Sequence, residues 1–243
     1  MRNHRTGTKR ALTNLLPGMM LLVLLNGCGP ALDLIDRYLA DEEDMTPTEL
    51  MEQGREDLDK GYYSGAADTF ERIKDRYPYS RHAIEAELKM ADALYEKKAY
   101  EEALDAYDDF EKLHPNNKFI PYVIYQKGMC YYQQIRTVDR QQTNTLQAKG
   151  EFERVVKRFP RNEFANWARK KIRDCLIFLS EYELYVGHFY FKQGKYRAAM
   201  NRYNFVIKNY PDVGQYHEAL EYLRKCKENI AEEEETLKKE AKT

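Results

Sequence analysis

Residue types that perform catalysis are present in this sequence, but they form no recognised catalytic arrangement. Hydrolases place a nucleophile beside a histidine, and zinc sites need closely spaced histidine, cysteine or carboxylate ligands. No serine lies in a G-x-S-x-G context, and the five histidines show no H-E-x-x-H and no metal-ligand spacing with cysteine. No G-x-G-x-x-G or G-x-x-x-x-G-K phosphate loop occurs, and neighbouring carboxylates such as Glu101 and Glu102 suit a solvated helix face. We therefore expect no enzymatic activity, no metal site and no cofactor.

One cysteine has a sequence context that predicts a covalent modification. Residues 1–10 contain four basic side chains and no acidic one, and a mostly apolar stretch follows, the pattern of a secretory signal. This stretch ends in Leu25-Asn26-Gly27-Cys28, which resembles a bacterial lipobox. The resemblance implies a diacylglyceryl group on Cys28, cleavage after Gly27 and acylation of the new N-terminus. The alternatives are an ordinary signal peptide with an incidental cysteine, or an uncleaved anchor.

Composition and charge limit the possible functions further. The chain has 243 residues with 39 basic and 40 acidic side chains, so it lacks the basic excess of a nucleic-acid-binding protein. Only one long apolar run occurs, at the N-terminus, which argues against several membrane spans. Glycine rather than aspartate follows Cys28, and in bacteria that retain aspartate-marked lipoproteins at the inner membrane this directs the protein to the outer membrane. We expect a lipid-anchored protein on the periplasmic face of the cell outer membrane.

One spacing pattern, aromatic-x-x-Ala-x-x-x-aromatic-x₇-Pro, occurs four times along the chain. The alanine and the second aromatic are four residues apart, so they lie on the same face of a helix. The small alanine lets a neighbouring helix approach, the aromatic fills the space beside it, and the proline ends the helix. The copies are Tyr63, Ala66, Phe70 and Pro78; Tyr100, Ala103, Tyr107 and Pro115; Thr145, Ala148, Phe152 and Pro160, with Thr145 replacing the first aromatic; and Tyr196, Ala199, Tyr203 and Pro211.

Each copy is predicted to be the second helix of a helix–turn–helix unit whose first helix also carries a small residue. Gly54, Ala91 and Gly187 stand at the same distance before the alanines of the first, second and fourth copies. In the third copy the small residue, Gly128, lies further away, which predicts an inserted polar loop within residues 134–144.

The junction between the third and fourth units is longer than the others. It contains 14 additional residues between the proline and the next small residue, close to four helical turns, so a helix can absorb them without rotating its apolar face. Residues 164–193 contain no proline. We therefore expect one helix of about 30 residues there, or two helices with a break near Ser180.

The two ends of the repeat region also carry helix signals. Thr46-Pro47-Thr48-Glu49 has the form of a capping box with proline at the first helical position. After the last repeat a further helix is expected from Gly214 to about Asn229, with Arg224 where the small residue would stand. This helix is interpreted as a solvated terminal cap, and the final residues are interpreted as a helical tail.

The repeated pattern resembles the tetratricopeptide repeat, in which stacked helical pairs bury faces that no single pair can bury alone. The resemblance implies an all-α fold, a right-handed superhelical solenoid of about five helical pairs with a long helix before the fourth unit's second helix. The expected organisation is a lipoprotein signal peptide (1–27), an acidic linker (28–45), the repeat domain (46–230) and a charged tail (231–243).

A stiff stack without a catalytic arrangement is expected to act by binding partners along the concave side of its first helices. Mixed charge with aromatic side chains suits an extended peptide, although each residue could instead be merely solvated. The 20 tyrosines are attributed chiefly to repeat packing, and a minority could line this peptide groove. The candidate substrate-groove residues are Glu52, Arg55, Asp59, Glu85, Lys89, Asp92 and Tyr95.

The lipobox and the repeats together resemble the BamD (ComL) family of outer-membrane β-barrel assembly lipoproteins. The segments that carry the resemblance are GYYSGAADTFERIKDRYPYS, PYVIYQKGMCYY, FERVVKRFPRNEFANWARKKI and LSEYELYVGHFYFKQGKYRAAMNRYNFVIKNYPD. The resemblance implies a periplasmic scaffold of the barrel assembly (BAM) complex, whose N-terminal repeats receive unfolded outer-membrane protein substrates. Its C-terminal repeats would bind the BamA-like barrel-forming subunit, with accessory lipoproteins in the same complex.

The same resemblance indicates which residues bind the barrel-forming subunit. Arg202, in the segment MNRY, and Arg197 are expected to supply a basic contact, although Arg202 could equally be a surface charge. Arg136, Asp139 and Arg140 lie in the inserted loop, where that family is variable, and form a second candidate partner surface.

Two other functions share the predicted anchor and fold. A pilotin-like lipoprotein that assembles pilus or secretin rings would lack the helix extension and the inserted loop. A generic periplasmic repeat adaptor normally carries a coiled coil before its repeats, and none is evident here. The remaining cysteines, Cys130, Cys175 and Cys226, are odd in number and fall in helical patterns, so we expect them to be small buried residues.

Overall fold

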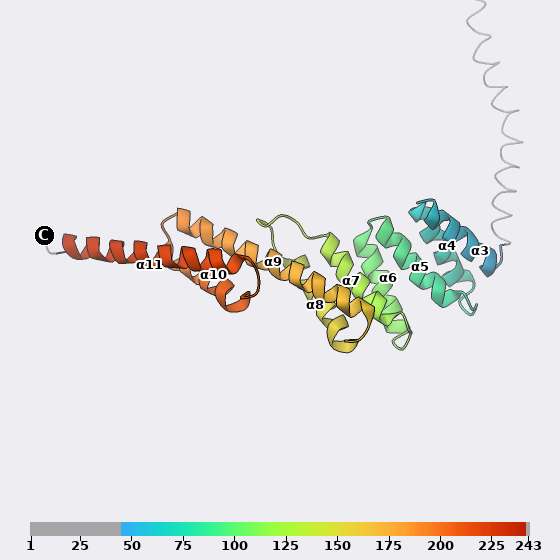
Figure 1. Cartoon of the computed structure of the whole chain (residues 1–243). Helices are drawn as coiled ribbons and strands as arrows, with labels where there is room; N and C mark the ends of the chain where they lie inside the picture. The colour runs from blue at the N-terminus through green and yellow to red at the C-terminus, as the bar shows by residue number, and fades with distance from the viewer. Residues whose placement is uncertain (1–44, 242–243) are drawn as a thin grey trace, which may run out of the picture. The chain divides into compact units, whose positions relative to one another are not determined.

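The computed structural model describes residues 45–241 of the chain, and every regular element in that range is an α-helix (Figure 1). The predicted signal peptide, Cys28 and nearly all of the predicted linker lie outside the described residues. The chain divides after Leu50 into two compact units. The division falls within the first described helix, and all residues from Met51 onward belong to the second unit. The helices are α3 (Pro47–Asp59), α4 (Tyr63–Arg76), α5 (Ala83–Glu96), α6 (Tyr100–Leu113), α7 (Ile120–Gln133), α8 (Thr143–Arg158), α9 (Glu163–Lys192), α10 (Tyr196–Asn209) and α11 (Gln215–Glu240).

The predicted capping box begins the first of these helices. The backbone N–H of Thr46 donates to Glu49 Oε2 (2.8 Å), and the backbone N–H of Glu49 donates to Thr46 Oγ1 (3.3 Å). These reciprocal bonds satisfy amide groups that have no partner within the first turn. The hydrogen bond from the Thr46 backbone also lowers the pKa of the Glu49 carboxyl.

Successive helices pack against one another in chain order, as the repeat pattern predicts. From α4 onward each helix contacts the next, and α9 additionally contacts α7 and α11. The second helices α4, α6, α8 and α10 each end two residues before the repeat proline, because proline cannot continue a helix. The fold is an all-α tetratricopeptide-repeat solenoid, as the sequence predicts.

Within each unit, the small residue of the first helix lies against the aromatic residue of the second. A Cβ atom built on Gly128 would lie 2.6 Å from the Phe152 ring, and a Cβ atom built on Gly187 would lie 2.6 Å from the Tyr203 ring. Such a distance is well inside van der Waals contact, so these positions admit glycine because the two helices approach closely. In the second unit Ala91 occupies this position opposite Tyr107, and both residues are fully buried.

Replacing Gly128 with alanine is therefore expected to destabilise the protein. Overpacking of a buried site costs about 1–3 kcal/mol, which exceeds the gain of at most about 1 kcal/mol from better helix propensity. Urea unfolding followed by circular dichroism measures the difference. The reciprocal control is Ala91→Gly, which creates no clash and should lower the free energy of unfolding by no more than about 1 kcal/mol. Equal stability of wild type and Gly128→Ala would contradict the proposed close packing.

The long junction forms one helix. α9 spans 30 residues without a break at Ser180, whose buried hydroxyl donates to the carbonyl oxygen of Ile177 (2.8 Å). Asn162 caps its first turn, because the Asn162 side-chain oxygen accepts from the backbone N–H of Phe164 (3.0 Å). Of the two alternatives, the single helix is confirmed.

Two further length predictions concern the inserted loop and the last helix. The predicted loop is present, because residues 134–142 separate α7 from α8. The last predicted helix and the predicted helical tail form one element, since α11 continues without a break to Glu240. Ion pairs between side chains four residues apart, such as Lys239 with Glu235 (2.7 Å), accompany this polar extension.

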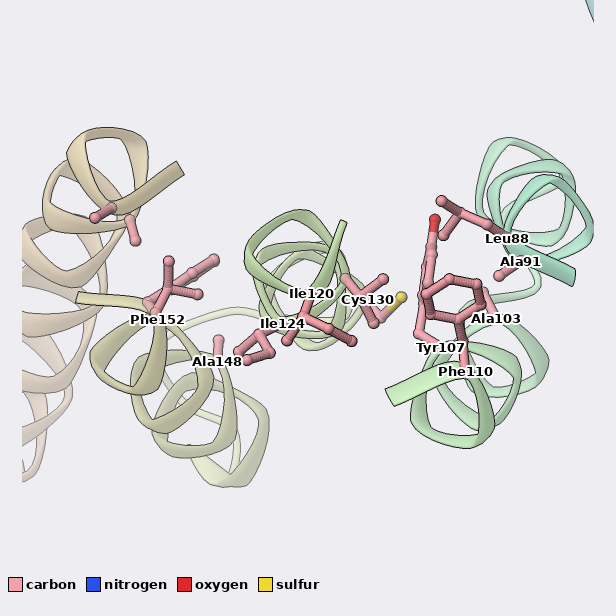
Figure 2. Packing of buried hydrophobic residues seen from close by; sticks show 14 of the residues in the cluster. Leu88, Ala91, Ala103, Tyr107, Phe110, Ile120, Ile124, Cys130, Ala148 and Phe152 are labelled. Carbon is pink, nitrogen blue, oxygen red and sulfur yellow. The ribbon is translucent and has the colours of Figure 1, made fainter. Parts of the chain in front are cut away.

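Two hydrophobic clusters share α9. The first joins buried residues of α5, α6, α7 and α8 to Ala165, Ala168 and Cys175 in the first half of α9. Figure 2 shows its centre, where residues of α7 lie between the aromatic side chains of α6 and Phe152 of α8. The second cluster joins Leu184, in the second half of α9, to α10 and α11.

The three cysteines of the described chain are free and fully buried, as expected for packing residues. Burial raises the pKa of Cys130 and of Cys175 to about 12, so both remain protonated thiols at neutral pH. No helix among residues 45–241 combines the length and apolar character that a membrane span requires.

Candidate functional site

The predicted substrate residues lie on the first helices of the first two units. Glu52, Arg55 and Asp59 are exposed on α3, and Glu85 is exposed on α5. The Arg55 guanidinium donates to Glu85 Oε1 at 2.6 Å, so one ion pair joins α3 to α5. Both side chains are about half exposed, so solvent screens this pair and its charges are accessible to a ligand.

Asp92 is the centre of a hydrogen-bond network at this surface. Its Oδ1 accepts from the Tyr107 hydroxyl (2.8 Å) and the Tyr122 hydroxyl (2.7 Å), and its Oδ2 accepts from Lys89 Nζ (3.1 Å). The Asp92 side chain is 15% exposed. Burial, followed by the nearby Asp92 charge, raises the pKa of both tyrosines, so their hydroxyls stay protonated donors.

The structure adds residues of α7 that the sequence analysis missed. Gln126 Nε2 donates to the Tyr122 hydroxyl (3.2 Å), and Gln133 Nε2 donates to the Tyr95 hydroxyl (3.1 Å). Tyr122 and Gln126 occupy the positions in the third unit that Glu85 and Lys89 occupy in the second. Extending the repeat register by one unit would have identified both.

Aromatic side chains continue this surface from α7 onto α9. Tyr122 contacts Phe164 with ring centroids 5.3 Å apart, Tyr125 contacts Trp167 (6.0 Å), and Phe164 contacts Trp167 edge-to-face (5.0 Å). Trp167 is 45% exposed. Tyr122 thus connects Asp92 of α5 to an accessible aromatic cluster. Such a combination can bind peptide backbone and apolar side chains together.

The predicted partner residues Arg197 and Arg202 both lie on α10 and are partly neutralised by other helices. Arg202 Nη1 donates to Glu183 on α9 (2.9 Å), and Arg197 Nη2 donates to Glu234 on α11 (2.7 Å). The Arg202 side chain is 41% exposed, whereas Glu183 is 13% exposed. The hydrogen bond to Glu183 raises the pKa of Arg202.

The inserted loop places its charged residues in a different repeat unit, between α7 and α8. Arg136 and Arg140 line a polar pocket of about 360 Å³ together with Asn144 at the start of α8. Asp139 accepts from the Thr137 hydroxyl and lies 4.0 Å from Arg140 Nε. The two groups of predicted partner residues therefore lie on different elements, one in the loop between α7 and α8 and the other on α10.

Within residues 45–241 no three histidine, cysteine or carboxylate side chains gather in a way that could hold a metal ion. The side chains described above donate and accept hydrogen bonds or offer aromatic contact. Their arrangement favours protein binding.

A family model described as "Outer membrane lipoprotein" (YfiO) matches residues 43–243, which include the whole repeat region. The chain belongs to the YfiO family of outer membrane lipoproteins. The YfiO match begins close to the start of the described residues and covers every helix reported above.

Several curated relatives of this YfiO chain carry the name "Outer membrane protein assembly factor BamD". The protein of Rickettsia prowazekii is 34% identical over 212 residues, which cover 86% of this chain and 81% of that protein. The Caulobacter vibrioides protein is 35% identical, and the match covers 72% of this chain but only 57% of that protein. The protein of Neisseria meningitidis serogroup B is 27% identical, and the match covers 78% of this chain and 74% of that protein.

Solved structures resemble this YfiO chain more distantly. The MamA protein has a TM-score of 0.40 and 15% identity, with 81% of this chain and 94% of that chain covered. The TPR2AB domain of yeast Sti1, solved as a complex with pHSP90, has a TM-score of 0.43 and 16% identity. The match covers 76% of this chain and 74% of that chain.

Proposed function

We propose that this protein is a lipid-anchored periplasmic scaffold that takes part in assembling β-barrel proteins in the outer membrane. It binds unfolded barrel substrates with its N-terminal repeats and a BamA-like barrel-forming subunit with its C-terminal repeats. Accessory lipoproteins share the complex. The observation that carries this proposal is the match of the entire repeat region to the family of relatives named as outer membrane protein assembly factors.

The substrate-binding part of the proposal is supported by the first-helix surface. Unfolded chains present backbone amides and carbonyls along an extended segment, and these groups need polar partners. Arg55, Glu85 and Lys89 on α3 and α5 offer charged partners of both signs, while Trp167 on α9 offers an exposed aromatic surface. Charged and aromatic side chains together suit a substrate that carries apolar side chains on a polar backbone.

The partner-binding part is supported by the state of Arg202. Its guanidinium is held by Glu183 in a fixed direction, yet remains accessible to solvent. A positioned and accessible guanidinium binds a partner carboxylate with little loss of side-chain freedom. The Arg197 side chain is more exposed, at 75%, so it suits a peripheral contact.

Affinity purification of the tagged protein from solubilised outer membranes tests the function as a whole. We expect a large β-barrel subunit with periplasmic repeats to be recovered, identified by mass spectrometry. Recovery of a secretin alone would instead support the pilotin-like function. Recovery of neither would refute both.

Charge reversal at Arg202 is expected to reduce recovery of the barrel-forming subunit about tenfold, which corresponds to roughly 1.4 kcal/mol of binding free energy. The reversal places an acid beside Glu183 and repels a partner carboxylate. The measurement is quantitative co-purification of Arg202→Glu against wild type. The matched control is Arg224→Glu, since Arg224 is also an exposed arginine paired with a glutamate, but on α11. Unchanged recovery with Arg202→Glu would remove this residue from the partner surface.

A further inference from the structure

In α5, α7 and α11 two small or apolar positions face the preceding second helix. They stand five residues before and two residues after the position occupied by Ala91 in α5 and Gly128 in α7. In α5, α7 and α11 both positions are fully buried, and each of these helices packs against the second helix before it. Figure 2 shows one of them, Cys130, facing the aromatic residues of α6. The residue pairs are Ala86 and Ala93, Val123 and Cys130, and Ala219 and Cys226.

α9 contains this pair of positions twice, 14 residues apart, because it joins two first helices end to end. In its first half the pair is Ala168 and Cys175, both fully buried in the cluster that includes α8. In its second half the pair is Tyr182 and Phe189. Tyr182 is only half-buried and Phe189 is 51% exposed. No described helix covers the second pair as α8 covers the first, because the second half packs on α10 and α11.

The first half of α9 also lacks a second helix of its own. The position that holds a small residue in the complete units holds Arg173 here, and Arg173 is exposed. In α11, the last helix of the stack, the same position holds Arg224, which is also exposed. In the complete units the same position holds glycine or alanine against an aromatic ring. The stack is therefore one second helix short at the middle of α9.

α10 contributes to the same region. Phe205 occupies the position in α10 that Arg154 occupies in α8, and Arg154 reaches the preceding second helix by donating to Glu111 of α6 (2.6 Å). Phe205 is 45% exposed. Arg202 lies one turn before it and pairs with Glu183 of α9. We call the surface formed by Tyr182, Phe189, Arg202 and Phe205 the uncovered face.

The residue types of the uncovered face differ from those of a true end of the stack. At the start of the array, α3 has Glu56 at the position of Phe189, and this glutamate is exposed and paired with Lys60 (2.7 Å). Terminal repeats keep such faces polar so that they remain soluble. Half-exposed aromatic residues around an ion pair are instead typical of a binding surface.

We propose that the uncovered face binds an amphipathic α-helix of a partner protein, which takes the position of the second helix that the stack lacks between the two halves of α9. This inference rests on the proposed function in that the partner belongs to the barrel assembly complex. A helix is the occupant because second helices of this chain cover the same positions of α5, α7, the first half of α9 and α11. Arg202, the accessible member of its ion pair, matches an acidic residue among the apolar residues of that helix.

Site-specific photo-crosslinking of the full-length protein in its membrane complex tests this inference. The photoreactive residue p-benzoylphenylalanine replaces Phe189 or Phe205 in separate chains, and Phe119 in a control chain. Phe119 is also a phenylalanine, 43% exposed, but lies at the start of α7. We expect chains labelled at 189 and 205 to attach to one segment of one partner, at partner residues three, four or seven apart. The chain labelled at 119 should not attach to that segment.

Other outcomes overturn the inference and separate it from the proposed function. Attachment to partner residues two apart would indicate a strand, attachment to a second copy of this chain would indicate self-association, and recovery of the partner without attachment would exclude contact. Helical spacing on a protein outside barrel assembly would leave the helix inference standing and refute the proposed function. Recovery of the barrel-forming subunit without helical spacing would do the reverse.

A pair of variants checks the energetic importance of the face. Phe189→Lys combined with Phe205→Lys is expected to reduce recovery of the crosslinked partner at least tenfold, whereas Phe119→Lys should leave it unchanged. All three side chains are about half exposed, so the thermal unfolding midpoints of the variants should match the wild type. Equal loss of recovery in the control and the double variant would also contradict the proposal.

Discussion

Replacing Lys127 with alanine is expected to lower the free energy of unfolding by about 3 kcal/mol, the lower end of the cost of breaking a buried ion pair. Lys127 lies on α7 and is 5% exposed. Its Nζ donates to Asp108 (2.6 Å) and Glu111 (3.1 Å) of α6. Without the ammonium group, Glu111 keeps Arg154 at 2.6 Å and Arg158 at 3.2 Å, so its charge is not left entirely unpaired. Urea unfolding of the purified protein measures the change.

The same variant should alter the response to acid. Burial opposes ionisation of Glu111, but hydrogen bonds from Arg154 and Lys127 outweigh it and lower its pKa, and those from Lys112 and Lys127 lower the pKa of Asp108. Carboxyls with lowered pKa values stabilise the fold above their ordinary values of 4.5 and 3.8, and this stabilisation is lost as the pH falls through the folded-state values. Lys127→Ala should therefore lose less stability than the wild type on acidification below about pH 4.5.

Lys112 provides the control for this cluster because it pairs with the same carboxylate. Its Nζ lies 2.6 Å from Asp108, but its side chain is 66% exposed. Solvent screens exposed ion pairs strongly, so Lys112→Ala should leave the unfolding midpoint almost unchanged. If both lysine variants were equally stable, burial would not be the source of the stabilisation.

Replacing Cys28 with alanine is expected to remove the protein from the outer membrane. Each buried methylene of an acyl chain contributes about 0.8 kcal/mol, and one chain gives only reversible binding whereas several give stable anchoring. The variant cannot receive the thioether-linked diacylglyceryl group that the lipobox predicts. Density-gradient fractionation measures its location, and intact-mass spectrometry of the wild type should show residues 28–243 with added acyl groups.

A second cysteine variant controls for general effects of thiol removal. Cys226 is buried at the interface of α10 and α11 and is a free thiol, so Cys226→Ala should remain in the outer membrane. An unmodified mass for the wild type, or outer-membrane location of Cys28→Ala, would refute lipid anchoring.

Much of the fold could be predicted because the same spacing of small, aromatic and proline residues recurs in each repeat unit. The spacing of Ala103, Tyr107 and Pro115 fixes one helix, its buried face and its end by local stereochemistry alone. The 14-residue extension predicts a single long helix for the same reason, since four turns preserve the apolar face. The sequence pattern separates the last helix from a helical tail, whereas α11 is continuous, because the charged residues that mark the end of a buried face are also good helix formers.

The candidate surfaces were less predictable than the helices. Repeat position selects Asp92 and the family resemblance selects Arg202 as candidates, but neither indicates that Asp92 is held by two tyrosine hydroxyls or that Arg202 is partly neutralised by Glu183. These contacts join residues 15 to 30 positions apart on different helices. Their geometry depends on how neighbouring helices are rotated and spaced, which residue type does not encode.

The sequence alone determined the lipobox pattern, the absence of any catalytic motif, the repeat register and the helix-ending prolines, because each depends on residues close together in the chain. Only the tertiary structure decided which first-helix positions are covered. Ala168 and Tyr182 occupy the same register position on one continuous helix, yet one is fully buried and the other is not. The reason is physical: burial of a helix face requires a second helix against it, and α8 extends along only the first half of α9.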